Sequence, residues 1–94
     1  MRVRWLRAAL LNLDQEATHI ASEDPVAADV VVKRILSAIS MLAEQPGLGR
    51  PGRVPGTREL IIARTPYCVP YRVRGDAMEI LRVFHTSRRP PDQW

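Results

Sequence analysis

The chain has 94 residues, of which 46% are hydrophobic and 26% are charged, and its formal net charge is +4. This length allows a single core and excludes two domains, and the hydrophobic content excludes an intrinsically disordered chain. We therefore expect one globular domain over residues 1–94.

The lone cysteine, Cys68, can form no internal disulfide and has no histidine at metal-ligand spacing, so we expect a reducing compartment, no metal and no cofactor. The N-terminus begins like a signal peptide, but Asn12 and Asp14 interrupt its apolar run and no small-residue cleavage site follows. No stretch approaches the roughly 20 apolar residues of a membrane span. These features predict a cytoplasmic protein with no membrane partner.

The positive charge is concentrated in the C-terminal half. Residues 1–49 carry five basic and six acidic side chains, whereas residues 50–94 carry nine arginines and four acids. Thirteen of the fourteen cations are arginine, the side chain that forks onto phosphate or carboxylate. This clustering indicates an anionic partner, although a solvated basic surface explains any single arginine equally well.

The first half predicts a strand and a helical hairpin. Residues 1–5 alternate apolar residues with arginine, as in a short strand. Apolar residues then recur at helical spacing over residues 6–44. Asp24 followed by Pro25 is typical of a cap with proline at the first helical position, so a second helix should start there.

The second half predicts a loop, three strands and a tail. Residues 45–57 contain three prolines and four glycines, which exclude a helix or a strand interior. Gly75-Asp76 is a typical tight-turn pair between alternating segments. The strand-like runs are 58–64, 67–74 and 78–85, and the tail is 86–94.

The element order β-α-α-β-β-β predicts the α+β class, with a small antiparallel sheet and the N-terminal helical hairpin packed on one face. Pro70 would remove a ladder hydrogen bond, so its strand is at an edge, bulged, or paired so that residue 70 needs no donor. Alternation assigns the odd-numbered residues of 67–74 to the core. In the last run it places Val83 and His85 on the same side as Glu79.

Three segments, "AALLNLDQEATHIA", "GRPGRVPGTREL" and "PYCVPYRVRGDAMEILRVFH", resemble the ParE/RelE superfamily of toxins from type II toxin-antitoxin modules. The resemblance covers nearly all of the chain. It implies a bacterial toxin that is neutralised, in a hetero-oligomer, by a small antitoxin, ParD-like or similar. It also implies that the antitoxin wraps the toxin through an amphipathic helix and an extended stretch.

The superfamily divides by target: RelE-like members cut mRNA on the ribosome, and ParE-like members inhibit DNA gyrase. RNA cleavage needs several cations and a general acid or base on one face. RelE-like toxins carry an arginine three residues before the strand tyrosine, where this chain has Cys68 before Tyr71. They also carry lysines around the second strand, whereas the only lysine here, Lys33, lies in a predicted helix. "YRVRGDAMEILRVFHTS" is similar to the ParE pattern, whose histidine, matched by His85, is not an established catalyst. The resemblance therefore favours inhibition of gyrase by binding.

Three hypotheses remain open: a gyrase-binding toxin, a ribosome-dependent mRNA endonuclease, and a toxin-fold protein that retains only antitoxin binding. The endonuclease would use Arg72, Arg82 and His85. Each of these residues also has a purely structural explanation. His85 would be a strand-end imidazole bonded to the backbone, and the arginines would form an internal salt-bridge lattice with Glu59 and Glu79. The residues expected to bind the target or the antitoxin are Arg58, Arg64, Arg72, Arg74, Arg82, His85, Arg88 and Arg89.

Overall fold

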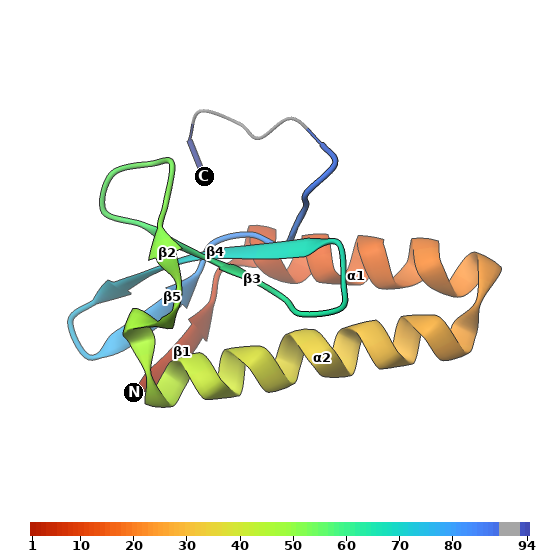
Figure 1. Ribbon diagram of the computed structural model, residues 1–94, viewed down its shortest axis with the longest axis horizontal. Coiled ribbons are helices and arrows are strands. Elements are labelled where there is room, and N and C mark those ends of the chain that lie inside the picture. Colours follow the sequence, from red (N-terminus) through yellow and green to blue (C-terminus); the bar gives the residue numbers. More distant parts are fainter. Residues whose placement is uncertain (89–92) are drawn as a thin grey trace.

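A helical hairpin and a twisted sheet form the two layers of the molecule (Figure 1). The computed structural model describes residues 1–88 and 93–94. Helix α1 spans Arg7–Glu23 and helix α2 spans Pro25–Glu44. The Asp24 carboxylate accepts a hydrogen bond from the Ala27 amide at 3.1 Å, as expected for an N-cap. The predicted hairpin is confirmed, and no helix in the described part of the chain is long and apolar enough to cross a membrane.

The sheet has the order β1-β5-β4-β3-β2, and β6 also pairs with β4. The pairs β2–β3, β3–β4, β4–β5 and β4–β6 are antiparallel, but β1 runs parallel to β5. The α+β class is therefore confirmed, while the sheet is mixed rather than wholly antiparallel. Parallel pairing is possible because the long connection between β1 and β5 can return the chain in the same direction. The strands are β1 Arg2–Trp5, β2 Arg50–Pro51, β3 Arg58–Ile61, β4 Tyr67–Arg74, β5 Ala77–Ile80 and β6 Phe84–His85.

The proline- and glycine-rich segment 45–57 is more ordered than expected, because it contains a 3₁₀ turn at Pro46–Leu48 and the short edge strand β2. The Gly49 amide donates to the Tyr71 hydroxyl at 2.8 Å, and that hydroxyl donates to the Pro46 carbonyl at 2.6 Å. A Cβ atom at residue 49 would lie 2.6 Å from the Tyr71 ring, so glycine is required by close approach. These contacts hold the segment against the core.

The core lies between the helices and the facing side of the sheet. As alternation predicts, the odd-numbered residues Tyr67, Val69 and Tyr71 of β4 are buried there, together with residues of α2 such as Ile35 and Leu42. Val73, near the far end of the same strand, is exposed instead, although its cross-strand partner Met78 is fully buried.

Pro70 lies in the central strand β4, opposite a one-residue bulge. Tyr71 pairs with Ile80, but Cys68 pairs with Phe84, so the partner strand advances four residues where β4 advances three. The predicted single run 78–85 is consequently two strands, β5 and β6. Of the three arrangements open for Pro70, an edge strand is excluded, and the bulge lies in the neighbouring strand.

The bulge moves the side chains after it to the other face of the sheet. Val83 packs in the core, and His85 pairs with the core residue Tyr67. Glu79 lies on the opposite face, beside its partner Arg72. The expectation that Val83 and His85 share a face with Glu79 is therefore wrong, because it assumed unbroken alternation.

Candidate functional site

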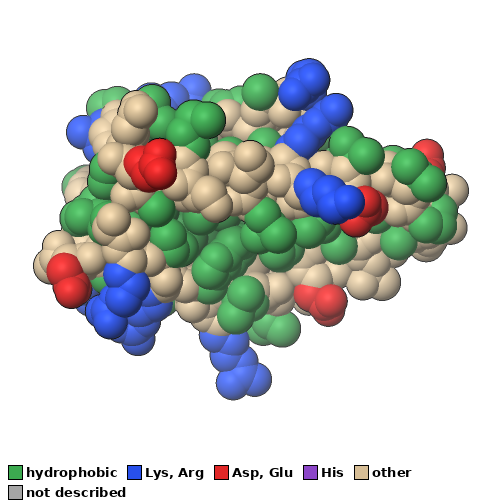
Figure 2. Space-filling view, turned by 90° about the horizontal axis from the view of Figure 1, so that it is seen from below, with side chains coloured by type: hydrophobic (Ala, Val, Ile, Leu, Met, Phe, Trp, Pro, Cys, Tyr) green, Lys and Arg blue, Asp and Glu red, His purple; other side chains and the backbone are tan. Residues whose placement is uncertain are grey.

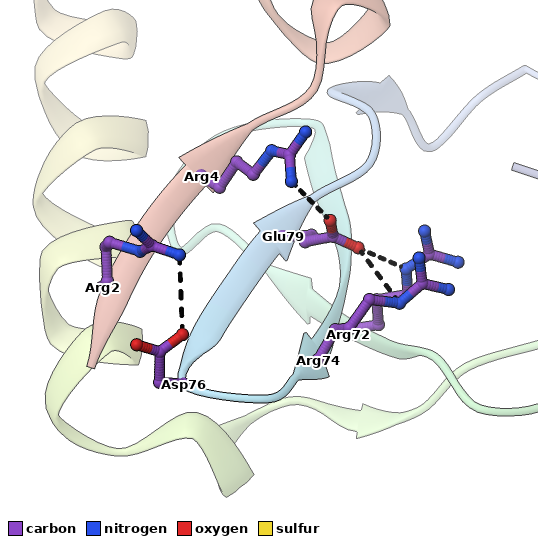
Figure 3. A network of polar contacts seen from close by, with 6 residues as sticks. All are labelled: Arg2, Arg4, Arg72, Arg74, Asp76 and Glu79. Atoms are coloured by element: carbon purple, nitrogen blue, oxygen red, sulfur yellow. Dashed lines mark hydrogen bonds and ion pairs between the residues drawn. The ribbon is translucent and has the colours of Figure 1, made fainter.

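The sheet face turned away from the helices carries guanidinium groups gathered around one carboxylate (Figure 3). Glu79 of β5 receives the Arg72 Nε at 2.7 Å, the Arg4 guanidinium at 3.7 Å and the Arg74 Nε at 3.9 Å. Arg4 reaches it from β1, and the other two arginines reach it from β4. We call Arg4, Arg72, Arg74 and Glu79 the cationic cluster.

The charges of the cationic cluster do not balance. The hydrogen bond from Arg72 and the nearby charges of Arg74 and Arg4 hold the pKa of Glu79 below its ordinary value, so this carboxylate stays ionised at neutral pH. One negative charge faces three positive ones. The Glu79 side chain is 5% exposed, whereas those of Arg4 and Arg74 are 67% exposed. The cluster therefore presents its excess positive charge to solvent.

A hollow of about 740 Å³ adjoins the cationic cluster and is lined by Arg72, Arg74, Leu81, residues 54–57 and Trp94. The Trp94 ring packs edge-on against Phe84, with ring centroids 5.7 Å apart. Among residues 1–88 and 93–94, the buried Trp94 indole N–H has no hydrogen-bond acceptor. The hollow is thus lined by two guanidinium groups and by a tryptophan whose N–H is buried.

His85 lies on the other side of the sheet. Its ring meets the Tyr67 ring edge-on, with centroids 5.3 Å apart. The His85 Nδ1 accepts from the Ser87 amide at 3.2 Å and lies 2.7 Å from the Ser87 hydroxyl, so the proton of the neutral ring belongs on Nε2. This local bonding matches the structural explanation for the histidine.

Arg88 is an internal ion-pair partner of α1. Its guanidinium donates to the carboxylate of Glu16, which is 7% exposed and also accepts from the Tyr67 hydroxyl at 3.2 Å. Burial, reinforced by Glu16, raises the pKa of Tyr67 to about 12. Sequence reasoning missed Glu16, although an acid three residues after Leu13 and four before Ile20 stands on the apolar face of a helix.

The three residues predicted as a nuclease set are not brought together. Arg72 belongs to the cationic cluster, His85 faces the helices, and Arg82 donates to the Leu81 carbonyl at 2.6 Å beside the bulge. Of the remaining predicted residues, Arg58 donates to the Gly49 carbonyl at 2.8 Å. Arg89 lies outside the described residues.

An apolar groove lies between α2 and β3. It encloses about 550 Å³, and Val30, Met41, Leu48 and Ile61, which line it, are all exposed. Figure 2 shows hydrophobic side chains gathered across this side of the molecule, with basic side chains at the margins. Because β2 pairs only with Arg58 and Glu59, the edge of β3 beyond them is open along the groove. We call this feature the α2–β3 groove.

The basic margin of the α2–β3 groove is formed by Lys33, Arg34 and Arg64. The Arg34 guanidinium donates to the Arg64 carbonyl at 3.0 Å. Arg64 has a φ of 62°, a left-handed conformation that is unfavourable for a residue with a side chain. The sequence predicted Arg64 as a binding residue but did not reveal the α2–β3 groove. The apolar residues of α2 that line the groove lie beside the helical stripe that faces the core, so spacing alone does not separate the two sets.

A hairpin of two helices packs on a mixed sheet and leaves an apolar groove exposed to solvent. The fold superposes on the structure described as the chromosomal ParDE TA system from P. aeruginosa with a TM-score of 0.82 and 34% identity, covering 90% of this chain and 95% of that one. The family model described as ParE toxin of type II toxin-antitoxin system, parDE, matches residues 3–90. The chain belongs to this family of ParE toxins.

Two curated relatives are also described as toxins, one of them under a RelE name. Y4kP of Sinorhizobium fredii is 48% identical over 90 residues, which cover 96% of this chain and 93% of the relative. Toxin RelE2 of Caulobacter vibrioides is 32% identical over 87 residues, which cover 93% of this chain and 97% of the relative. Both similarities extend over nearly the whole domain.

Proposed function

We propose that this ParE-family toxin acts in the cytoplasm by binding DNA gyrase and inhibiting it, and that a cognate antitoxin neutralises it by occupying the α2–β3 groove. The observation that carries the first part is the separation of Arg72, Arg82 and His85, the groups that RNA cleavage would need together. The separation of these three groups supports action through contact with the target rather than through cleavage.

The ionic state of the sheet residues supports binding over cleavage. Cleavage of RNA requires cations and a proton donor or acceptor around one phosphate. Cys68 stands where RelE-like enzymes have arginine, and burial together with Glu59 raises the pKa of its thiol to about 11. A thiol is neutral and a thiolate is negative, so this side chain supplies no positive charge to a pentavalent phosphorus at any pH.

The α2–β3 groove supports the proposed antitoxin contact. Exposed apolar patches of this kind mark interaction sites, because water contact with the apolar side chains is unfavourable. An amphipathic segment could bury its apolar face against Val30, Met41 and Ile61 and place acidic side chains near Arg34 and Arg64. The open edge of β3 could also pair with an extended stretch of the same partner.

Parallel reactions test the target. Purified protein is added to a gyrase supercoiling reaction and to a translating ribosome reaction, each with Arg82→Ala and His85→Ala variants. We expect supercoiling to be inhibited and mRNA to stay intact. Site-specific mRNA cuts that disappear in the His85→Ala variant would favour the RelE-like endonuclease instead, and inactivity in both reactions would favour a protein that only binds antitoxin.

A groove variant tests the antitoxin contact. Ile61→Asp places a charge in the groove, and should abolish antitoxin protection while leaving gyrase inhibition unchanged. Val26→Asp is the matched control, because Val26 is an exposed apolar residue of α2 that does not line the groove. Equal antitoxin protection of both variants would exclude the α2–β3 groove as the binding site.

A further inference from the structure

We propose that the face of the sheet that carries the cationic cluster binds the phosphate backbone of single-stranded nucleic acid and does not cut it. This binding is a further activity, separate from contact with gyrase. It uses the face opposite the helices, and no residue of the cationic cluster lines the α2–β3 groove. The helix-facing His85 takes no part in it.

The first support is excess positive charge held in a fixed arrangement. Glu79 draws Arg4, Arg72 and Arg74 together from two strands and neutralises only one of the three. Within the described residues, neither Arg4 nor Arg74 makes another ion pair. Their remaining N–H groups can therefore bond to an incoming anion, and Glu79 limits the conformational entropy lost when they do so.

The second support is the hollow beside the cluster. Arg72 and Arg74 line it together with the loop residues 54–57 and Trp94. In Figure 1 the loop between β2 and β3 and the C-terminus both rise on the side of the sheet away from α2. A hollow bounded on two sides admits a single strand more readily than the wide cylinder of a duplex.

The third support is the buried indole N–H of Trp94, at the margin of this hollow, which has no acceptor in the part of the chain that the structure describes. A buried donor without a partner is rare in native proteins, because burial removes its hydrogen bond to water without replacing it. Phosphate and base oxygens are acceptors that a bound strand could bring to this donor after a small adjustment of the ring. The same ligand thus satisfies both the guanidinium groups and the indole.

Regular spacing favours a phosphate backbone over an acidic peptide. Arg72 and Arg74 are two residues apart on β4, and Arg2 and Arg4 are two residues apart on β1, so the guanidinium groups form two rows on either side of β5. A nucleic acid carries a charge on every residue and can follow such rows whatever its sequence. A peptide would need acidic residues at particular positions.

Fluorescence anisotropy tests the proposal with labelled single-stranded DNA and RNA of 12 nucleotides, and an oligo-glutamate of equal charge as competitor. We expect both nucleic acids to bind and the affinity to fall with salt. Arg4→Gln and Arg74→Gln should each weaken binding about tenfold and reduce the salt slope by about one. Lys33→Gln, on the groove margin, is the matched control and should change neither.

Glu79→Gln separates a ligand site from an internal salt-bridge lattice. Removing the competing carboxylate should tighten binding about fivefold, and Glu44→Gln, at the exposed C-terminal end of α2, is its control. The fold of each variant is checked by circular dichroism. Absence of binding at low salt, equal competition by oligo-glutamate, or equal loss in Lys33→Gln would overturn the proposal. Because no gyrase is present, these outcomes are independent of the proposed gyrase inhibition.

Discussion

The Leu81 amide donates to the Pro70 carbonyl at 3.0 Å, but the return bond of this cross-strand pair is missing because proline has no N–H. The Arg82 guanidinium donates to the Leu81 carbonyl at 2.6 Å and occupies the acceptor that the proline leaves free. The chain bulges directly after this pair. A predicted binding residue therefore has a structural task beside the bulge.

A double-mutant cycle tests this task. Arg82→Ala should lower the free energy of unfolding by about 1 kcal/mol, because a half-buried carbonyl loses its donor. In a Pro70→Val background the new amide can bond to Leu81, so the same change should cost measurably less. Urea unfolding gives both values. Equal costs in the two backgrounds would show that Arg82 does not replace the missing amide.

Removal of the buried carboxylate in α1 should destabilise the protein. Glu16→Ala leaves the Tyr67 hydroxyl and the Arg88 guanidinium without their acceptor, and we expect a loss of about 1–3 kcal/mol. Glu23→Ala, at an exposed position of the same helix, should stay within about 0.5 kcal/mol of the parent. Thermal unfolding of both variants measures the difference. Similar melting temperatures would contradict this account of Glu16.

Alkaline pH should destabilise the fold through Tyr67. The pKa of its hydroxyl is about 12 in the folded state, against 10.0 for the ordinary group, so between these values the unfolded chain loses a proton that the folded chain keeps. The stabilising contribution is complete below pH 10 and disappears as the pH rises to about 12. Tyr67→Phe should unfold with a shallower pH dependence in this range. An unchanged slope would refute the assignment.

The Cys68 thiol should react slowly in the folded protein. Its pKa is raised from 9.0 to about 11 by burial and by Glu59, and the thiolate is the reactive form. At pH 8 we expect iodoacetamide to modify the native thiol at least about 100-fold more slowly than the urea-unfolded thiol, since two pKa units separate them. Mass spectrometry follows the reaction. Comparable rates would show that the thiol is accessible and ionised.

Arg64→Gly should stabilise the hairpin between β3 and β4. A left-handed conformation costs a residue with a side chain about 1 kcal/mol, and glycine avoids that cost. The Arg34 bond to the residue 64 carbonyl is a main-chain contact and would remain. We expect a gain of about 0.5–1 kcal/mol in urea unfolding, and no gain for Arg64→Ala. A gain in stability in both variants would show that the effect comes from loss of the arginine charge and not from the backbone conformation.

Elements governed by neighbouring residues were predictable from the sequence. The Asp24-Pro25 boundary between the helices and the Gly75-Asp76 turn both occur as expected, and Gly75 has the positive φ of 62° that the turn needs. The family resemblance also identified the toxin fold. The basic residues of the second half were recognised as a group, but their individual contacts were not.

The contacts that were missed join residues far apart in the chain. Glu79 binds Arg4, which is 75 positions away, and Glu16 binds both Tyr67 and Arg88. Strand order determines the first set, and the packing of α1 against the sheet determines the second. Neither leaves a periodic pattern in the sequence, so neither could be read from spacing alone.

The sequence by itself determined the helical hairpin, the tight turn at Gly75-Asp76 and the core side of β4, because each depends on residue spacing or on residue types within a short segment. The toxin family followed from the resemblance of three longer segments. Only the tertiary structure decided that β1 lies parallel to β5, that the chain bulges after Leu81, and that His85 and Arg72 face opposite sides. One extra residue in a strand reverses every later side chain, and the pairing that accommodates it forms only when the strands meet.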